Sequence, residues 1–295
     1  MSADFQLETP VVLLLFSRPA CTAAVFDRVR EARPPEIFIV QDAPRAHVAG
    51  ESLHCAEVRA IAGAVDWPCK VHWNVAAEHM GCMLRVSSGL SWVFSLTAEA
   101  IVLEDDCLPH PAFFRYCQEL LERYRDDQRI FSISGDNFNF GQRVFDYSYH
   151  FSLRFHCWGW ASWRRSWRSV DLNLSQWPSI REGSWLEDVV GHREGASDYR
   201  KAFDACRDYG ADTWAYRAAY SSVVNGRLNI HPGVNLVTNI GFGPGAHSGC
   251  TTHPLADIPV GDLELPLRHP PFLMRDFVAD RNAFDFIYNP VEART

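Results

Sequence analysis

The sequence predicts an α/β fold with a mixed, mostly parallel sheet flanked by helices. First, short apolar runs alternate with helix-like patterns through the first hundred residues, and repeated strand–helix–strand units form parallel sheets. Second, these runs are continuously apolar, which is typical of strands that are buried on both faces. Third, 47% of the 295 residues are hydrophobic, so the chain can bury a core without disulfides or metal ions.

Four strands and three helices are expected in the first hundred or so residues. Thr22 caps the first helix and Pro34-Pro35 ends it, because threonine accepts an N-terminal N–H and proline stops a helix. The second helix covers 57–64, and apolar residues at helical spacing place the third over 83–94. The four strands are expected at 11–15, 37–40, 70–75 and 100–103.

The second half of the chain is more irregular and rich in tryptophan. Pro111 begins a helix whose apolar stripe extends from Phe113 to Tyr124. No linker or repeat divides the chain, so residues 1–250 are expected to form a single domain. Residues 251–295 are rich in proline and weakly periodic, and we expect them to form a C-terminal arm that packs on or extends from this domain.

Charge and cysteine content exclude several classes of protein. Acidic residues outnumber lysine and arginine by 36 to 28, so no nucleic-acid partner bound through bulk charge is expected. The nine cysteines are scattered singly without a C-x-x-C pair, which suggests neither a zinc site nor a disulfide framework and indicates a reducing compartment. The N-terminus lacks a basic region, and the apolar run 11–16 is too short to span a bilayer. We expect a cytoplasmic protein, and peripheral contact with the inner face of a membrane stays open.

Charged segments directly follow three of the expected strands. These segments are Phe16-Ser17-Arg18-Pro19, Gln41-Asp42-Ala43-Pro44-Arg45 and Glu104-Asp105-Asp106. Ligands of parallel α/β sheets bind beyond the carboxyl ends of the strands. Burying three adjacent acids without a partner is costly, and a divalent cation removes that cost. A solvated acidic loop is the alternative.

The segment Leu103-Glu104-Asp105-Asp106-Cys107-Leu108-Pro109, followed by Phe113-Phe114 and Tyr116, resembles the D-x-D-type signature of GT-A glycosyltransferases. It is most similar to the branch of nucleotide-diphospho-sugar transferases that contains N-acetylglucosaminyltransferase I and its bacterial relatives. The resemblance covers roughly residues 10–250 and implies the Rossmann-like GT-A fold. Ala43 departs from the glycine that is more usual in this family.

The resemblance implies a role for each matching residue. Asp106 would bind Mn²⁺ or Mg²⁺ between the two phosphates of a nucleotide-sugar, and His247 could be a second metal ligand. Trp158 and Gly159 are assigned to the sugar pocket, because sugar C–H faces stack on aromatic rings. Trp160, Trp163 and Trp167 lie at helical spacing and are expected in the core. The expected nucleotide-sugar-binding residues are Arg18, Asp42, Asn74, Arg85, Glu104, Asp105, Trp158 and Gly159.

A catalytic base is also implied. In inverting GT-A enzymes an acid near Asp212 deprotonates the acceptor hydroxyl, so Asp212 is the first choice and Asp136 the second. Asp212 equally fits the N-cap of the helix that follows it. Ala215 stands where relatives often carry a further acid.

The sequence therefore predicts a metal-dependent, inverting glycosyltransferase. UDP-N-acetylglucosamine is the donor by family analogy, and the acceptor is a glycan or a lipid-linked glycan. One alternative is a sugar nucleotidyltransferase, which should carry a glycine-rich loop after the first strand that this chain lacks. Another is a catalytically idle carbohydrate-binding protein, which leaves three adjacent acids unexplained.

Overall fold

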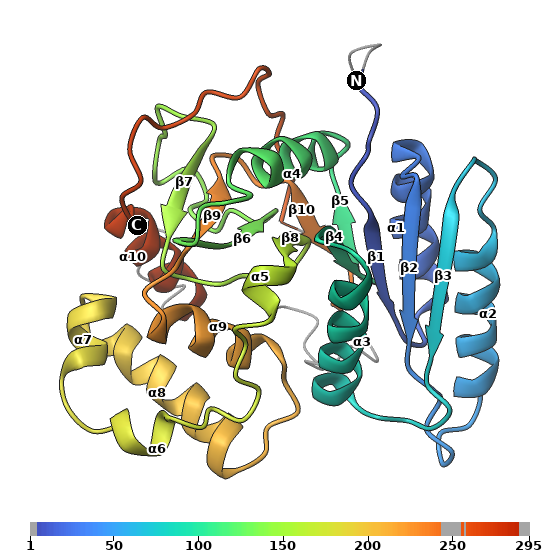
Figure 1. The fold of residues 1–295 in the computed structure, drawn as a ribbon, viewed down its shortest axis with the longest axis horizontal. Helices are drawn as coiled ribbons and strands as arrows, with labels where there is room; N and C mark the ends of the chain where they lie inside the picture. Colours follow the sequence, from blue (N-terminus) through green and yellow to red (C-terminus); the bar gives the residue numbers. More distant parts are fainter. Residues whose placement is uncertain (1–4, 243–254, 257, 289–295) are drawn as a thin grey trace.

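The computed structural model describes residues 5–242, 255–256 and 258–288 (Figure 1). Its centre is an eight-stranded sheet in the order β3-β2-β1-β4-β8-β6-β9-β7. Four of the seven strand pairings are parallel. Helices cover both faces of the sheet, so the predicted α/β class with a mixed, mostly parallel sheet is confirmed.

The first half of the chain forms the parallel part of the sheet. Alternate residues of the first strand face opposite layers, with Leu13 packing toward the first two helices and Leu14 toward the third. All four predicted strands are present. The elements are β1 (Val11–Leu15), α1 (Pro19–Ala32), β2 (Glu36–Gln41), α2 (Glu51–Gly63), β3 (Lys70–Val75), α3 (Cys82–Leu96) and β4 (Glu99–Glu104).

Two predicted helix starts in this half are wrong. Helix α1 begins at Pro19, where proline fits the first turn, and the Thr22 hydroxyl donates to the carbonyl of Arg18 from inside the helix. Helix α2 begins at Glu51, six residues before the predicted start. Gly50 adopts a left-handed conformation (φ 81°) just before it, and the Glu51 carboxylate pairs with Arg45. Pro19 is thus a local start signal that outweighs Thr22, whereas the start of α2 depends on the conformation of Gly50 and on the pairing of Glu51 with Arg45.

Antiparallel strands complete the sheet. After β4 the chain turns back through β5 (Cys107–Pro109), which pairs with β10 (Val237–Asn239), and enters α4 (Ala112–Arg123). Strand β8 (Trp160–Trp163) is antiparallel to both β4 and β6. The remaining strands are β6 (Ile130–Ser134), β7 (Tyr149–Ser152) and β9 (Leu228–Pro232).

The tryptophan-rich segment belongs to the core, but not as one helix. Trp160 and Trp163 lie on β8, and Trp167 ends the short helix α5 (Arg164–Trp167). All three side chains are buried. Strand β8 is an interior strand covered on both faces, so its residues are apolar or small throughout and imitate a helical pattern.

Further helices cover the second half of the sheet on the side of α3 (yellow and orange in Figure 1). They are α6 (Trp177–Ile180), α7 (Trp185–Val190), α8 (Arg193–Asp208) and α9 (Ala215–Val224). A last helix, α10 (Phe277–Tyr288), lies within the predicted arm, although the weak periodicity there did not predict it. Buried Asp280 accepts hydrogen bonds from the Ser152 hydroxyl and the Leu153 amide, which ties α10 to β7. Within the described part of the chain, no helix is long and apolar enough to cross a bilayer.

Three buried histidines meet beside β7 and β9. The ring of His231 lies 4.4 Å from that of His156 and 5.7 Å from that of His150, measured between centroids. His231 Nε2 lies 2.9 Å from the carbonyl oxygen of Arg154. Burial lowers the pKa of His231 from 6.5 to about 4, although the nearby carboxylate of Asp280 opposes this shift.

Acid is therefore expected to destabilise the fold through His231. Below pH 6.5 the unfolded chain binds a proton that folded His231 accepts only near pH 4, so this contribution to stability is full above pH 6.5 and disappears as the pH falls to about 4. The loss is about 3 kcal/mol over this range. Urea unfolding at several pH values should give a steeper acid slope for the wild type than for His231→Gln. Equal slopes would contradict this assignment.

Candidate functional site

Three adjacent acids lie at the carboxyl end of the central strand β4, one as its last residue and two just after it. We call them the acid cluster: Glu104, Asp105 and Asp106. The Asp105 side chain is nearly inaccessible, and its Oδ2 accepts the backbone N–H of Phe16 at the end of β1, 3.3 Å away. The backbone carbonyl of Asp106 accepts the N–H of Ile240, 2.9 Å away. Two distant parts of the chain therefore hold the acid cluster in place.

Arg18, between β1 and α1, bridges two members of the acid cluster. Its Nη1 lies 2.8 Å from Asp106 Oδ2, and its Nη2 donates to Asp105 Oδ1. Gly241 lies directly on this ion pair, because a Cβ built there would be 2.2 Å from Asp106 Oδ2 and 2.6 Å from Arg18 Nη1. Only glycine lets the chain after β10 approach so closely.

The acid cluster carries more negative charge than Arg18 compensates. Burial, followed by repulsion from Asp106 and Asp105, raises the pKa of Glu104 to about 8. Burial likewise raises the pKa of Asp105 to about 6, although Arg18 opposes the shift. Three carboxyl groups share one guanidinium, so a further cation would be stabilised here.

The donor atoms of the acid cluster suit a hard cation that is also held by its substrate. Both oxygens of Asp105 are engaged, but among the described residues Asp106 Oδ1 meets only the Cys107 thiol, 3.5 Å away. Among the residues that the structure describes, no three His, Cys, Asp or Glu side chains converge on a metal position. Magnesium-type ions are commonly held by one or two carboxylates together with phosphate oxygens. Glu104 and Asp106 fit that arrangement, and His247 lies outside the described residues.

The predicted nucleotide-side residues lie at the ends of β2 and β3. Asp42 accepts the backbone N–H groups of Met80 and Gly81, at 3.0 and 3.1 Å, and so holds the loop before α3. Arg85, in the first turn of α3, donates from Nη2 to the carbonyl and the side-chain oxygen of Asn74. Arg85 is buried, and its Nε has no hydrogen-bond partner among the described residues. A buried donor without a partner is costly unless a ligand completes it.

The sequence reasoning did not predict a group of three side chains beside Asp42, formed by Phe16, His79 and Arg45. The rings of Phe16 and His79 lie 5.3 Å apart, and the guanidinium of Arg45 lies 5.6 Å from the Phe16 ring. His79 Nδ1 also lies 3.0 Å from Asp42 Oδ2. Phe16 and Arg45 stand in the charged segments that follow the strands, which is the signal that could have identified them, whereas His79 shows no pattern.

Asp136 lies just past the carboxyl end of β6, close to Trp158 and Gly159, which come just before the start of β8. The N–H of Gly135 donates to the carbonyl of Gly159, 2.7 Å away, which joins the two segments. The Asp136 side chain is buried, accepts a hydrogen bond from Ser134 and has a pKa raised well above its usual range by that burial. Half-buried Trp158 packs edge-on against Phe242, with ring centroids 5.8 Å apart.

Asp212 caps a helix, but not the one expected. Its two carboxylate oxygens accept the backbone N–H groups of Cys82 and Met83 at the start of α3, at 3.0 and 2.7 Å. The helix that follows Asp212 in sequence, α9, begins at Ala215 without a side-chain cap. Asp212 is exposed, and each of its oxygens retains a lone pair for a further partner.

Comparisons with solved structures find similarity at low sequence identity. No family model and no curated protein sequence matches the chain. A mannosyltransferase from Pyrobaculum calidifontis, solved with GDP-Man and Mn²⁺, aligns with 12% identity and a TM-score of 0.36 over 55% of this chain and 46% of its own. A UDP-glucose pyrophosphorylase solved with UDP-glucose aligns with 9% identity and a TM-score of 0.36, covering 76% of this chain and 90% of its own. Mouse xyloside xylosyltransferase 1 aligns with 10% identity and a TM-score of 0.36, over 73% and 81% of the two chains. This chain thus spans less than half of the mannosyltransferase.

Proposed function

We propose that the protein is a glycosyltransferase that moves a sugar from a nucleotide-diphosphate donor to a hydroxyl group of a glycan or lipid-linked acceptor. The observation that carries the proposal is the acid cluster bridged by Arg18 at the carboxyl ends of β1 and β4. A UDP-sugar is the favoured donor, on the sequence resemblance. The function rests on the residues of this chain, because fold alone does not determine chemistry.

The donor would lie along the carboxyl edge of the sheet. The tilted rings of Phe16 and His79 offer an aromatic surface for the nucleobase, and the Nε of buried Arg85 offers a donor without a partner among the described residues. Arg18 supplies a positive charge to the diphosphate. Asp106, with Glu104, would hold Mn²⁺ or Mg²⁺, which when bound supplies positive charge that stabilises the departing diphosphate.

The acceptor would approach from the side of Trp158. In an inverting displacement, the acceptor oxygen bonds to the anomeric carbon while the bond from that carbon to the diphosphate oxygen breaks. The diphosphate keeps the electron pair, and a carboxylate takes the acceptor proton. Exposed Asp212 suits this role better than Asp136, because Asp136 is buried away from an incoming acceptor and burial raises its pKa well above the usual range.

Two substitutions at Asp212 separate proton transfer from helix capping. Asparagine can still cap α3 through its single amide oxygen, so Asp212→Asn should keep one of the two hydrogen bonds and most of the stability but lower turnover by about 100- to 10,000-fold. Asp212→Ala should also lose about 1 kcal/mol of unfolding free energy. Turnover and urea unfolding of both variants check this. Full turnover by Asp212→Asn would move the proton acceptor elsewhere.

A panel of nucleotide-sugars tests the function itself. Release of nucleoside diphosphate from a UDP-, GDP- or dTDP-sugar, in the presence of Mn²⁺ and glycan acceptors, is the expected result. A nucleotidyltransferase would instead release pyrophosphate from a nucleoside triphosphate and a sugar phosphate. A carbohydrate-binding protein would bind glycans without turnover. Either result would overturn the proposal.

A further inference from the structure

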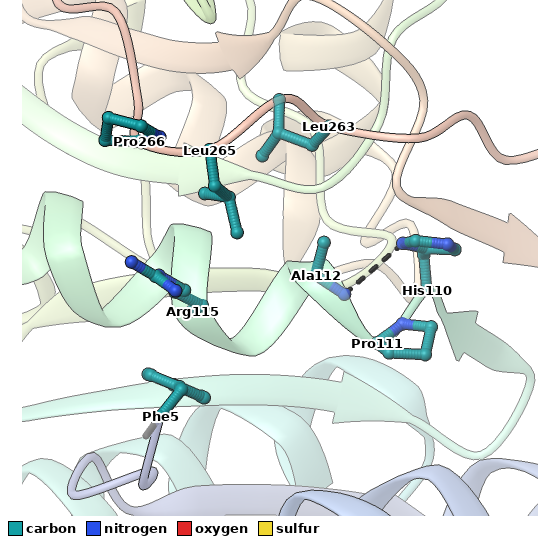
Figure 2. A pocket seen from close by; sticks show the side chains of 8 residues that line it. All are labelled: Phe5, His110, Pro111, Ala112, Arg115, Leu263, Leu265 and Pro266. Atoms are coloured by element: carbon teal, nitrogen blue, oxygen red, sulfur yellow. Dashed lines mark hydrogen bonds between the residues drawn. The ribbon is translucent and has the colours of Figure 1, made fainter. Parts of the chain in front are cut away.

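A cavity of about 560 Å³ lies beside the first turn of α4, away from the acid cluster. Figure 2 shows that its walls come from the segment before β1, from the start of α4 and from a C-terminal segment. Its lining residues are Phe5, His110, Pro111, Ala112, Arg115, Leu263, Leu265 and Pro266.

A C-terminal strap, residues 261–270, closes one side of this cavity and is fastened at both ends. At one end, the Gly261 N–H donates to the carbonyl of Asn235, 2.8 Å away, and His110 Nε2 lies 3.6 Å from the exposed carboxylate of Asp262. At the other, His269 Nε2 lies 3.2 Å from Glu119 Oε1 on α4, and His269 Nδ1 lies 3.0 Å from the hydroxyl of buried Tyr149. The strap therefore lies along α4, and its middle leaves the cavity open between the two fastenings.

The lining is apolar apart from one permanent cation and one imidazole. Leu263, Leu265 and Pro266 line it from the strap, and Phe5 from the opposite side of α4 (Figure 2). The Arg115 guanidinium lies 5.8 Å from the Phe5 ring, at the boundary of these apolar groups. His110 Nδ1 accepts the N–H of Ala112, 3.3 Å away. The acids of the strap, Asp262 and Glu264, are exposed to solvent and do not line the cavity.

The cavity is separate from the acid cluster. Phe5 precedes β1, whereas Arg18 follows it, so the two lie toward opposite ends of that strand. Strand β5 carries the chain from Asp106 to His110 between the two places. No residue of the acid cluster lines the cavity.

We propose that this cavity binds a small amphipathic anion, that is, an apolar chain or ring bearing a single acidic group. Its volume is in the range of small-molecule sites, and such sites are mostly apolar with a few polar groups that orient the ligand. The apolar body would lie against Leu263, Leu265 and Phe5. The acidic group would meet Arg115, whose guanidinium forms charge-assisted hydrogen bonds with carboxylate, sulfonate or phosphate.

Fluorescence titration of the full chain with 8-anilinonaphthalene-1-sulfonate tests this proposal. We expect saturable binding that Ala112→Trp abolishes by filling the cavity. Arg115→Gln should weaken binding by about tenfold or more, since a hydrogen bond to a charged group is lost. N-phenyl-1-naphthylamine, which lacks the sulfonate, should bind the wild type and Arg115→Gln equally. Arg28→Gln, on α1, is the matched control and should leave binding unchanged.

Competition identifies the source of the acidic group. Decanoate should displace the probe at about tenfold lower concentration than decanol, since decanol lacks the group that meets Arg115. Displacement by anionic phospholipid vesicles alone would indicate a membrane surface and overturn the proposal. Circular dichroism and thermal unfolding establish that each variant is folded. Unchanged binding by folded Ala112→Trp, or by folded Arg115→Gln, would also overturn it. None of these measurements depends on glycosyl transfer, so their failure leaves the proposed function untouched.

Discussion

Asp106→Asn is expected to lower nucleotide-sugar turnover by about 100- to 1,000-fold, the usual effect of removing one electrostatic stabiliser of developing charge. Asp106 pairs with Arg18, and within the described part of the chain its other oxygen meets only the Cys107 thiol. Asparagine keeps the shape of the side chain but removes its charge. The measurement is nucleoside diphosphate release over a range of Mn²⁺ concentrations, which should show a weaker dependence on the metal for the variant.

Two comparisons make this result specific. Asp27→Asn changes an exposed aspartate of α1 that lies outside the acid cluster, and its turnover should equal that of the wild type. Thermal unfolding of Asp106→Asn should show a folded protein, because Gly241 still packs on the side chain. Wild-type turnover by folded Asp106→Asn would refute the role of the acid cluster in the proposed reaction.

Arg18→Ala is expected to lower the unfolding free energy by about 2 kcal/mol in the presence of EDTA. Removing one partner of a buried ion pair leaves an uncompensated charge, which costs about 3–5 kcal/mol when both partners are buried. Asp105 is buried, but the Arg18 side chain is 32% exposed, so the expected loss is smaller. Urea unfolding at neutral pH measures it.

Divalent metal should then rescue Arg18→Ala more than it stabilises the wild type. With the guanidinium gone, Glu104, Asp105 and Asp106 have no described cation, so Mn²⁺ gains their attraction without competition. Arg28→Ala, which breaks an exposed pair on α1, should change stability by less than about 1 kcal/mol and show no extra metal effect. If Mn²⁺ raises the unfolding temperature of Arg18→Ala and of the wild type equally, or of neither, the acid cluster does not hold a cation.

The predictable part of the fold is the part that local patterns determine. Strands β1, β2 and β4 were predicted from short apolar runs between helical patterns, and β3 was predicted too although it alternates polar and apolar residues. The helical spacing of Trp160, Trp163 and Trp167 misled, because an interior strand covered on both faces carries apolar or small residues throughout and here places two tryptophans three residues apart. Helix α10 escaped prediction because its stability depends on Asp280 and β7 rather than on a regular apolar stripe.

The candidate site, like the fold, has features that the sequence could predict and features that it could not. The acid cluster and Arg18 could be placed at the ends of strands, since parallel strands bring their carboxyl ends to one edge. That Arg18 bridges Asp105 and Asp106 could not be predicted, nor could the contact of Asp212 with the start of α3, which joins residues 130 positions apart. His79 likewise reaches Asp42 only through the loop before α3.

By itself, then, the sequence determined the α/β class, the parallel strands and the edge at which the acids gather. These follow from burial and from periodicity, which act between neighbours along the chain. The tertiary structure alone decided which charges pair, which helix Asp212 caps and where a second cavity forms between α4 and the strap. Those features depend on side chains from distant segments that meet only once the core has packed.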